Sequence, residues 1–112
     1  MKVEGDGKLL RIFIGESDRH KGQPLFEAIV RKAHELGLAG ATAWQGIEGF
    51  GAHSRIHTAK ILRLSEDLPI IVEIVDAEDK IRALLPQIDA MMESAGSSGL
   101  ITMESVQVIK YE

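Results

Sequence analysis

The sequence predicts an α+β fold of the ferredoxin-like β-α-β-β-α-β type, in which a four-stranded antiparallel sheet carries two helices on one face. Two observations predict it. Apolar residues recur at helical spacing in two segments, and four other segments show the alternation or the short apolar runs of strands. The segments follow one another as strand, helix, strand, strand, helix, strand, and two helices can cover only one face of such a sheet.

The first predicted strand covers residues 8–15, KLLRIFIG, after a polar, glycine-bearing lead-in over residues 1–7 that we expect to be frayed. Its residues alternate between two faces that both have apolar character: Leu10, Ile12 and Ile14 point one way, and Leu9, Arg11 and Phe13 point the other. The segment ESDRHKGQ that follows is predicted to be a polar loop.

The first predicted helix begins near Pro24, which suits the first turn because its missing N–H costs nothing there. Glu27 and Arg31 have the i,i+4 spacing of an ion pair on the outer face, and Gly37 fits the position just past the helix end. The apolar stripe of this helix comprises Phe26, Ile29, Val30, Ala33 and Leu36.

The middle of the chain is predicted to form the second and third strands. The second covers residues 41–51, ATAWQGIEGFG, and is weakened by glycine towards its end, while residues 60–64 can resume a strand. The segment PIIVEIV over residues 69–75 is the clearest strand of the chain, with Pro69 at its first position or on a sheet edge.

The second helix is predicted to start after Asp76, whose side chain can cap it. Pro86 lies within its pattern, so either the helix kinks there or a short turn ends and the main helix restarts near Leu85. Its apolar stripe comprises Ile81, Leu84, Leu85, Ile88 and Met92.

A small-residue loop over residues 94–99 leads to two final strand pieces, LITM and VQVIKY. The apolar residues change parity between Met103 and Val106. This change predicts a bend or bulge near Glu104 and Ser105.

The first and third predicted strands carry apolar residues on both faces, although the helices can cover only one. In the third strand, Ile70, Val72 and Ile74 oppose Ile71 and Val75. We therefore expect the second face to be buried against other copies of the chain in a homo-oligomer, and the alternative is a partly exposed apolar sheet.

The composition bounds the size and the partners of the protein. A chain of 112 residues suffices for one domain with a modest core, so we expect a single domain over residues 1–112. Its net charge of −4 argues against duplex nucleic acid as a partner, and an aromatic content of 4% offers little for base stacking. It has no cysteine, which excludes disulfides and thiolate zinc sites. Neither a bilayer-spanning apolar run nor a signal peptide is recognisable, so we expect a cytoplasmic location.

A first glycine-rich stretch, with Gly46, Gly49 and Gly51 around Phe50, is a candidate ligand-binding segment. The order of its glycines fits neither a phosphate-binding loop nor a dinucleotide fingerprint. Taken alone, it can simply be a bulged strand end that leads into a flexible loop.

A second stretch, GSSG over residues 96–99, can direct several backbone N–H groups and the hydroxyls of Ser97 and Ser98 at one anion. It can equally be a plain helix-to-strand connection that ends the helix with a glycine cap. The two stretches would act together only if they meet, and in a ring of subunits the edge of one sheet can face the loop of the next.

His53 and His57 stand four residues apart, with Arg55 between them and Glu48 nearby. On a helix both imidazoles would share one face, as a metal pair requires, but the surrounding glycines argue against a helix and a third ligand would have to come from elsewhere. The alternative is histidines that face solvent or a phosphate, with Arg55 as the natural phosphate partner. No nucleophile–base pair is visible, so no catalytic residue is predicted.

The chain resembles PII-like signalling proteins, in particular the uncharacterised branch that shares the PII fold, over about residues 8–111. Gly49-Phe50-Gly51 resembles the glycine-phenylalanine-glycine at the base of the family's long T-loop. HSRIHTAKILRL and SEDLPIIVEIVD are similar to segments typical of this branch, and GLITMESVQVIKY is similar to the family's loop-strand-turn-strand ending.

The resemblance implies a homotrimer that binds an adenine nucleotide (ATP, ADP or AMP) in clefts between subunits and requires no other cofactor. A flexible loop over about residues 50–60 would signal the bound state to a partner such as a membrane transporter or an enzyme. The residues that would form the cleft are Gly49, Phe50 and Gly51 at the loop base, Gly96, Ser97, Ser98 and Gly99 around the phosphate, and Lys110 at a basic family position.

Three positions depart from the pattern of the PII-like family. Ala52 replaces the arginine that follows glycine-phenylalanine-glycine, Leu100 replaces the basic residue of the loop, and serines stand where an aspartate is usual. Arg55 and His57 could compensate at the phosphates. The alternatives are a metal-binding, CutA-like trimer that uses His53 and His57, and a structural family member with an empty cleft.

Overall fold

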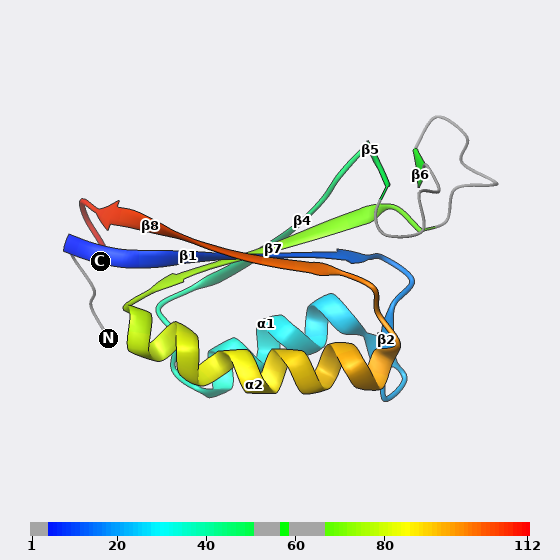
Figure 1. Ribbon diagram of the computed structural model, residues 1–112, viewed down its shortest axis with the longest axis horizontal. Coiled ribbons are helices and arrows are strands. Elements are labelled where there is room, and N and C mark those ends of the chain that lie inside the picture. The colour runs from blue at the N-terminus through cyan, green and yellow to red at the C-terminus, as the bar shows by residue number, and fades with distance from the viewer. Residues whose placement is uncertain (1–4, 51–56, 59–66) are drawn as a thin grey trace.

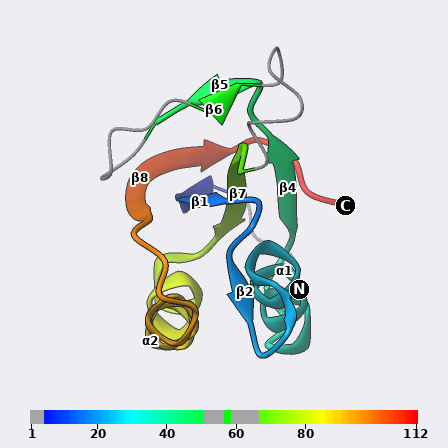
Figure 2. The same cartoon turned by 90° about the vertical axis from the view of Figure 1, so that its right-hand side faces the viewer.

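The computed structural model describes residues 5–50, 57–58 and 67–112. It confirms the predicted α+β fold: one antiparallel sheet in the order β4-β7-β1-β8 carries both helices on the same face (Figures 1 and 2). The sheet consists of β1 (Gly5–Gly15), β4 (Ala41–Gln45), β7 (Pro69–Asp76) and β8 (Leu100–Val108), and the helices are α1 (Leu25–Glu35) and α2 (Glu78–Ala95). Two short hairpins, β2–β3 (Arg19–His20 and Gln23–Pro24) and β5–β6 (Glu48–Gly49 and His57–Thr58), complete the described elements.

The core lies between the helices and the central strands β1 and β7. As predicted, β1 turns Leu10, Ile12 and Ile14 towards the helices, where all three are buried. Strand β7 contributes Ile70, Val72 and Ile74 to the same layer, and the helices contribute Leu25, Ala28, Ile29, Ala33, Ile81, Leu84, Ile88, Met91 and Met92. Because the two helices sit on one face, no described helix covers the other face of the sheet (Figure 2).

Helix α1 lies where it was predicted, but its ends and its buried face are shifted: the buried residues are Leu25, Ala28, Ile29 and Ala33, whereas Phe26 and Val30 are only partly buried. Pro24 is the N-cap residue that directly precedes the helix, and not part of its first turn. Glu27 and Arg31 form the predicted ion pair at 3.4 Å, and Gly37 adopts a left-handed conformation (φ 76°) just past the helix end. Leu36, predicted to lie on the apolar stripe, is 41% exposed because it is the C-cap residue, where the chain leaves the helix.

Asp76 does not cap α2, which corrects the sequence prediction. The N-cap residue is Ala77, and no side chain bonds to the free N–H groups of the first turn. Instead the fully buried Asp76 carboxylate accepts bonds from the backbone N–H of Ala39 (2.8 Å) and of Ala77 (2.7 Å). It therefore ties the loop before β4 to the start of α2. The helix itself continues unbroken over Pro86.

Two strand predictions were wrong at one end. Strand β1 begins at Gly5 and not at residue 8, because its first residues pair with the end of β8. Strand β4 ends at Gln45 and does not reach residue 51, because it pairs with β7 only as far as Ile70 and the chain then enters β5.

Strand β8 is continuous and keeps a constant register with β1 from Leu100 to Val108, so the predicted bulge near Glu104 is not there. Its parity change arises because Ile101 and Met103 face the helices, whereas Val106 and Val108 lie on the opposite face. The predicted strand over residues 60–64 lies outside the described residues.

The segment predicted as a polar loop after β1 contains the β2–β3 hairpin, with a tight turn at Lys21 and Gly22, both at positive φ. The described helices include none that is long and apolar enough to cross a membrane.

Candidate functional site

The first glycine-rich stretch packs against Pro69 at the start of β7. The backbone N–H of Gly46 donates to the carbonyl of Pro69 at 2.7 Å. A Cβ added to Gly46 would lie 2.8 Å from the proline ring, and one added to Gly49 would lie 3.2 Å from it. A side chain at Gly46 would force the chain or the proline ring to shift, and one at Gly49 would make a tight contact with the same ring, so the bare backbone helps to set the course of the segment that leads to Phe50.

Phe50 follows β5 and is 69% exposed. Strand β5 rises on the side of the sheet away from the helices (Figures 1 and 2). The backbone of His57 pairs with Gly49 in the β5–β6 hairpin. The remaining predicted residues of this segment, Gly51, His53 and Arg55, and the side chain of His57, lie outside the described residues.

The loop over residues 96–99, termed here the glycine-rich loop, ends α2 as a glycine cap. Gly96 is left-handed (φ 65°), and its N–H donates to the carbonyl of Glu93 at 3.1 Å. The N–H of Ser97 donates to the carbonyl of Met92 at 3.0 Å. A Cβ on Gly99 would collide with the carbonyl oxygen of Phe13 and lie 2.8 Å from the methyl group of Met92. Helix capping and close packing thus account for both glycines, and two of the predicted anion-binding N–H groups are engaged within the chain.

The hydroxyl of Ser97 is also engaged, by a residue that the sequence did not single out. It donates to Oδ2 of Asp18 at 2.8 Å, and the N–H of Gly15 donates to the same oxygen at 3.0 Å. Asp18 stands 79 positions from Ser97 in a turn after β1, so no local pattern signals the contact. The glycine-rich loop therefore lies against a carboxylate that comes from the far end of the chain.

The two candidate stretches lie at the same end of the sheet but on opposite edges. Gly49 and Phe50 follow the edge strand β4, the glycine-rich loop precedes the edge strand β8, and β7 and β1 lie between them (Figure 1). One chain therefore does not bring them together. Lys110 lies beyond the far end of β8, where its ammonium pairs with Glu112 at 3.3 Å, so within one chain it is remote from both.

The sheet face without helices, termed here the open face, has an apolar row that crosses all four strands. The register aligns Trp44 with Ile71, Ile71 with Phe13, and Phe13 with Leu100. Trp44 is 52% exposed and Leu100 57% exposed. A contiguous apolar row of this kind is typical of surfaces that contact another protein.

An ion cluster lies next to the apolar row on the open face. Nε of Arg11 donates to Glu73 at 2.7 Å, and Nη1 of Arg11 pairs with Glu104. The hydrogen bond to Glu73, with the charge of Glu104, raises the pKa of the Arg11 guanidinium. Each of the two carboxylates contacts the guanidinium, but one cation against two anions leaves the cluster with a net charge of −1.

Among the described residues, no group of three or more histidine, aspartate or glutamate side chains could hold a metal ion.

The model of the DUF190 family, described as an uncharacterized ACR, matches residues 7–108. The chain belongs to the DUF190 family. A UPF0166 protein of Aquifex aeolicus (strain VF5) is 40% identical to this DUF190 chain over 102 residues, which cover 91% of this chain and 92% of the relative.

Solved structures similar to this DUF190 chain include PII-like proteins. CPII of Thiomonas intermedia K12, a nitrogen regulatory PII-like protein bound to ADP, AMP and bicarbonate, superposes with a TM-score of 0.70 and 19% identity, covering 94% of this chain and 90% of CPII. A putative PII-like signaling protein of Thermus thermophilus superposes with a TM-score of 0.65 and 18% identity, covering 98% of this chain and all (100%) of that one. At these identities the likeness establishes the PII-like fold.

Proposed function

We propose that this chain is the subunit of a homotrimeric regulatory protein that binds an adenine nucleotide in the clefts between subunits. The main observation in support is that the segment around Gly49 and the glycine-rich loop lie at the same end of the sheet, on opposite edges. A neighbouring copy that places its β4 edge beside the β8 edge of this chain would bring Gly49 and Phe50 of one subunit to the glycine-rich loop of the other. The nucleotide-bound CPII structures support a site of this class by analogy.

The open face supports the assembly. Burying the row formed by Trp44, Ile71, Phe13 and Leu100 between copies would remove a large apolar surface from water, which is the main driving force of association. The Arg11 cluster keeps a net charge of −1, so it would lie at the rim of that interface, where water or a cation of the neighbouring copy can reach it, because burying an unpaired charge would oppose association.

The regulatory output would come from the segment over about residues 50–60. A nucleotide can shift this loop only if it binds its two states with unequal affinity. By analogy with the PII-like fold, the protein that reads the loop is a membrane transporter or an enzyme. The proposed role is regulatory binding, without a catalytic residue.

The test is a thermal shift of the purified protein with ATP, ADP, AMP and zinc, each alone, together with its mass in solution. A ligand that binds the native state raises the melting temperature by mass action. A rise with one adenine nucleotide on a trimer is the expected result. A rise with zinc alone would favour the metal-binding alternative, and no rise with any ligand would favour a structural role.

A pair of glycine variants sharpens the test. Gly51→Val should abolish nucleotide binding and leave the trimer intact, because a side chain at the loop base would occupy space that the nucleotide needs. Gly40→Val is the matched control, since a Cβ there meets open space and Gly40 lies in the loop before β4, at the other end of the sheet. Unchanged affinity in Gly51→Val would contradict the proposed site.

A further inference from the structure

The carboxylate of Asp18 is held firmly beside the glycine-rich loop. Its Oδ2 accepts from Ser97 and from the N–H of Gly15, while its backbone N–H donates to the carbonyl of Gly15 at 3.2 Å. Its own carbonyl accepts from the N–H of Leu25, the first residue of α1, at 2.8 Å. With side chain and backbone both fixed, this negative charge cannot easily move away from the loop.

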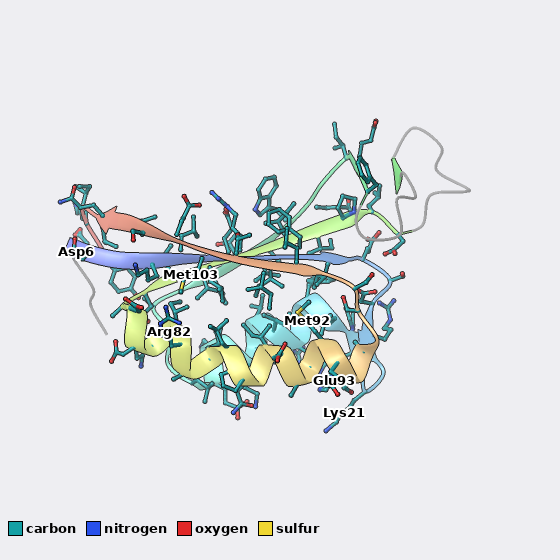
Figure 3. The ribbon with its side chains drawn as sticks, in the orientation of Figure 1. Asp6, Lys21, Arg82, Met92, Glu93 and Met103 are labelled. Atoms are coloured by element: carbon teal, nitrogen blue, oxygen red, sulfur yellow. The ribbon has the colours of Figure 1, made fainter. Side chains whose placement is uncertain are left out.

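The end of α2 adds to the negative character of the glycine-rich loop, whereas the nearby guanidinium of Arg19 donates to the backbone carbonyl of Asp18 at 3.3 Å and not to its carboxylate. The loop follows the C-terminus of α2, where the helix dipole places partial negative charge, and the last turn of α2 holds no basic residue. Glu93 lies in that turn, at the end of the molecule opposite to Asp6 (Figure 3). An ordinary phosphate-binding loop has the opposite arrangement, with a helix N-terminus and a cation facing the anion.

We propose that Asp18 is a specificity-determining residue that makes the glycine-rich loop discriminate against ligands with a high phosphate charge. The inference rests on the proposed nucleotide site. A fixed carboxylate repels each additional phosphate charge, and repulsion is stronger in a partly buried site than in bulk water. The site should therefore accept AMP, or a nucleotide whose phosphates are neutralised by Mg²⁺, in preference to free ATP.

The experiment compares the affinities of AMP and of ATP without Mg²⁺ for the wild-type protein and for Asp18→Asn. The amide keeps an oxygen that can accept from Gly15 and Ser97 but removes the charge. We expect the ratio of ATP affinity to AMP affinity to be about tenfold higher in Asp18→Asn than in the wild type, because ATP places more negative charge near this side chain than AMP does. Loss of a merely structural contact would instead weaken both ligands together.

Two further variants make the comparison decisive. Asp6→Asn changes the net charge equally at the opposite end of the sheet and should leave the ratio unchanged (Figure 3). Asp18→Ser also removes the charge, and the serine hydroxyl can hydrogen-bond to the local backbone. This serine variant is used if Asp18→Asn does not fold.

The outcomes separate the two proposals. An unchanged ratio in the folded Asp18 variants, with nucleotide still bound, overturns the role of Asp18 and leaves the proposed site standing. Failure of the wild type and of every variant to bind any adenine nucleotide overturns the site and this inference together.

Discussion

Replacing Asp76 by alanine should be among the most destabilising single changes in this protein. The carboxylate is fully buried and accepts two backbone hydrogen bonds, at 2.8 Å from Ala39 and at 2.7 Å from Ala77. A bond to a charged acceptor contributes about 1.5–3 kcal/mol, and each buried N–H left without a partner is costly. Allowing for water that enters the vacated space, we expect Asp76→Ala to lower the free energy of unfolding by about 3–5 kcal/mol.

Asparagine at the same position should cost less. The amide keeps one oxygen acceptor but points an NH₂ group at the second backbone donor, so Asp76→Asn should lose about half as much, roughly 1.5–3 kcal/mol. If the free energy of unfolding rises from the alanine variant to the asparagine variant and again to the wild type, the two steps measure the two hydrogen bonds separately.

Urea unfolding followed by circular dichroism measures both changes, at one fixed protein concentration because association alters apparent stability. Asp89→Ala is the control, since Asp89 is an exposed carboxylate on the same helix and should change stability by less than about 0.5 kcal/mol. A loss below about 1 kcal/mol for Asp76→Ala would refute the assignment of Asp76 as the residue that joins the β4 loop to α2.

Two other predictions address the open face and a surface ion pair. Trp44→Lys should lower the mass of the assembly in solution towards that of a monomer, because a lysine in the apolar row would have to be buried without a partner. Gln87→Lys, on the exposed side of α2, should keep the wild-type mass, and a full-size assembly in Trp44→Lys would exclude this face as the interface. The pKa of Glu78 is lowered by the hydrogen bond from Arg82 at 2.7 Å and by the charge of Lys8, so this carboxylate stabilises the fold above its ordinary pKa and loses that contribution as pH falls through its lowered pKa. Arg82→Gln should raise the pKa of Glu78 in an NMR titration and reduce stability at neutral pH but not in acid, and an unshifted titration would show that the pair is broken in solution.

The sequence was sufficient for the elements whose periodicity is long and uniform. The alternation over Leu10, Ile12 and Ile14 identified the covered face of β1, and the helical stripes of α1 and α2 gave the layer that covers it. These features are local, because burial on one side repeats with the geometry of a strand or a helix.

Features that depend on a distant partner could not be predicted in this way. Asp76 looked like a helix cap, yet one of its donors is Ala39, 37 positions away. Gly99 looked like part of an anion cradle, whereas the carbonyl of Phe13 leaves no room for a side chain there. No sequence pattern pointed to Asp18, because its contact with Ser97 forms only when the chain folds.

The placement of the two candidate stretches on opposite edges of one sheet has a genetic consequence. In the proposed trimer each cleft draws its loop base from one polypeptide and its glycine-rich loop from the next. Two defective alleles, one altered at the loop base and one in the glycine-rich loop, would each give a protein without a working cleft. Produced together, they would form mixed rings, and each mixed ring contains one junction at which an intact base meets an intact loop. Such alleles should therefore complement each other in a cell that carries both.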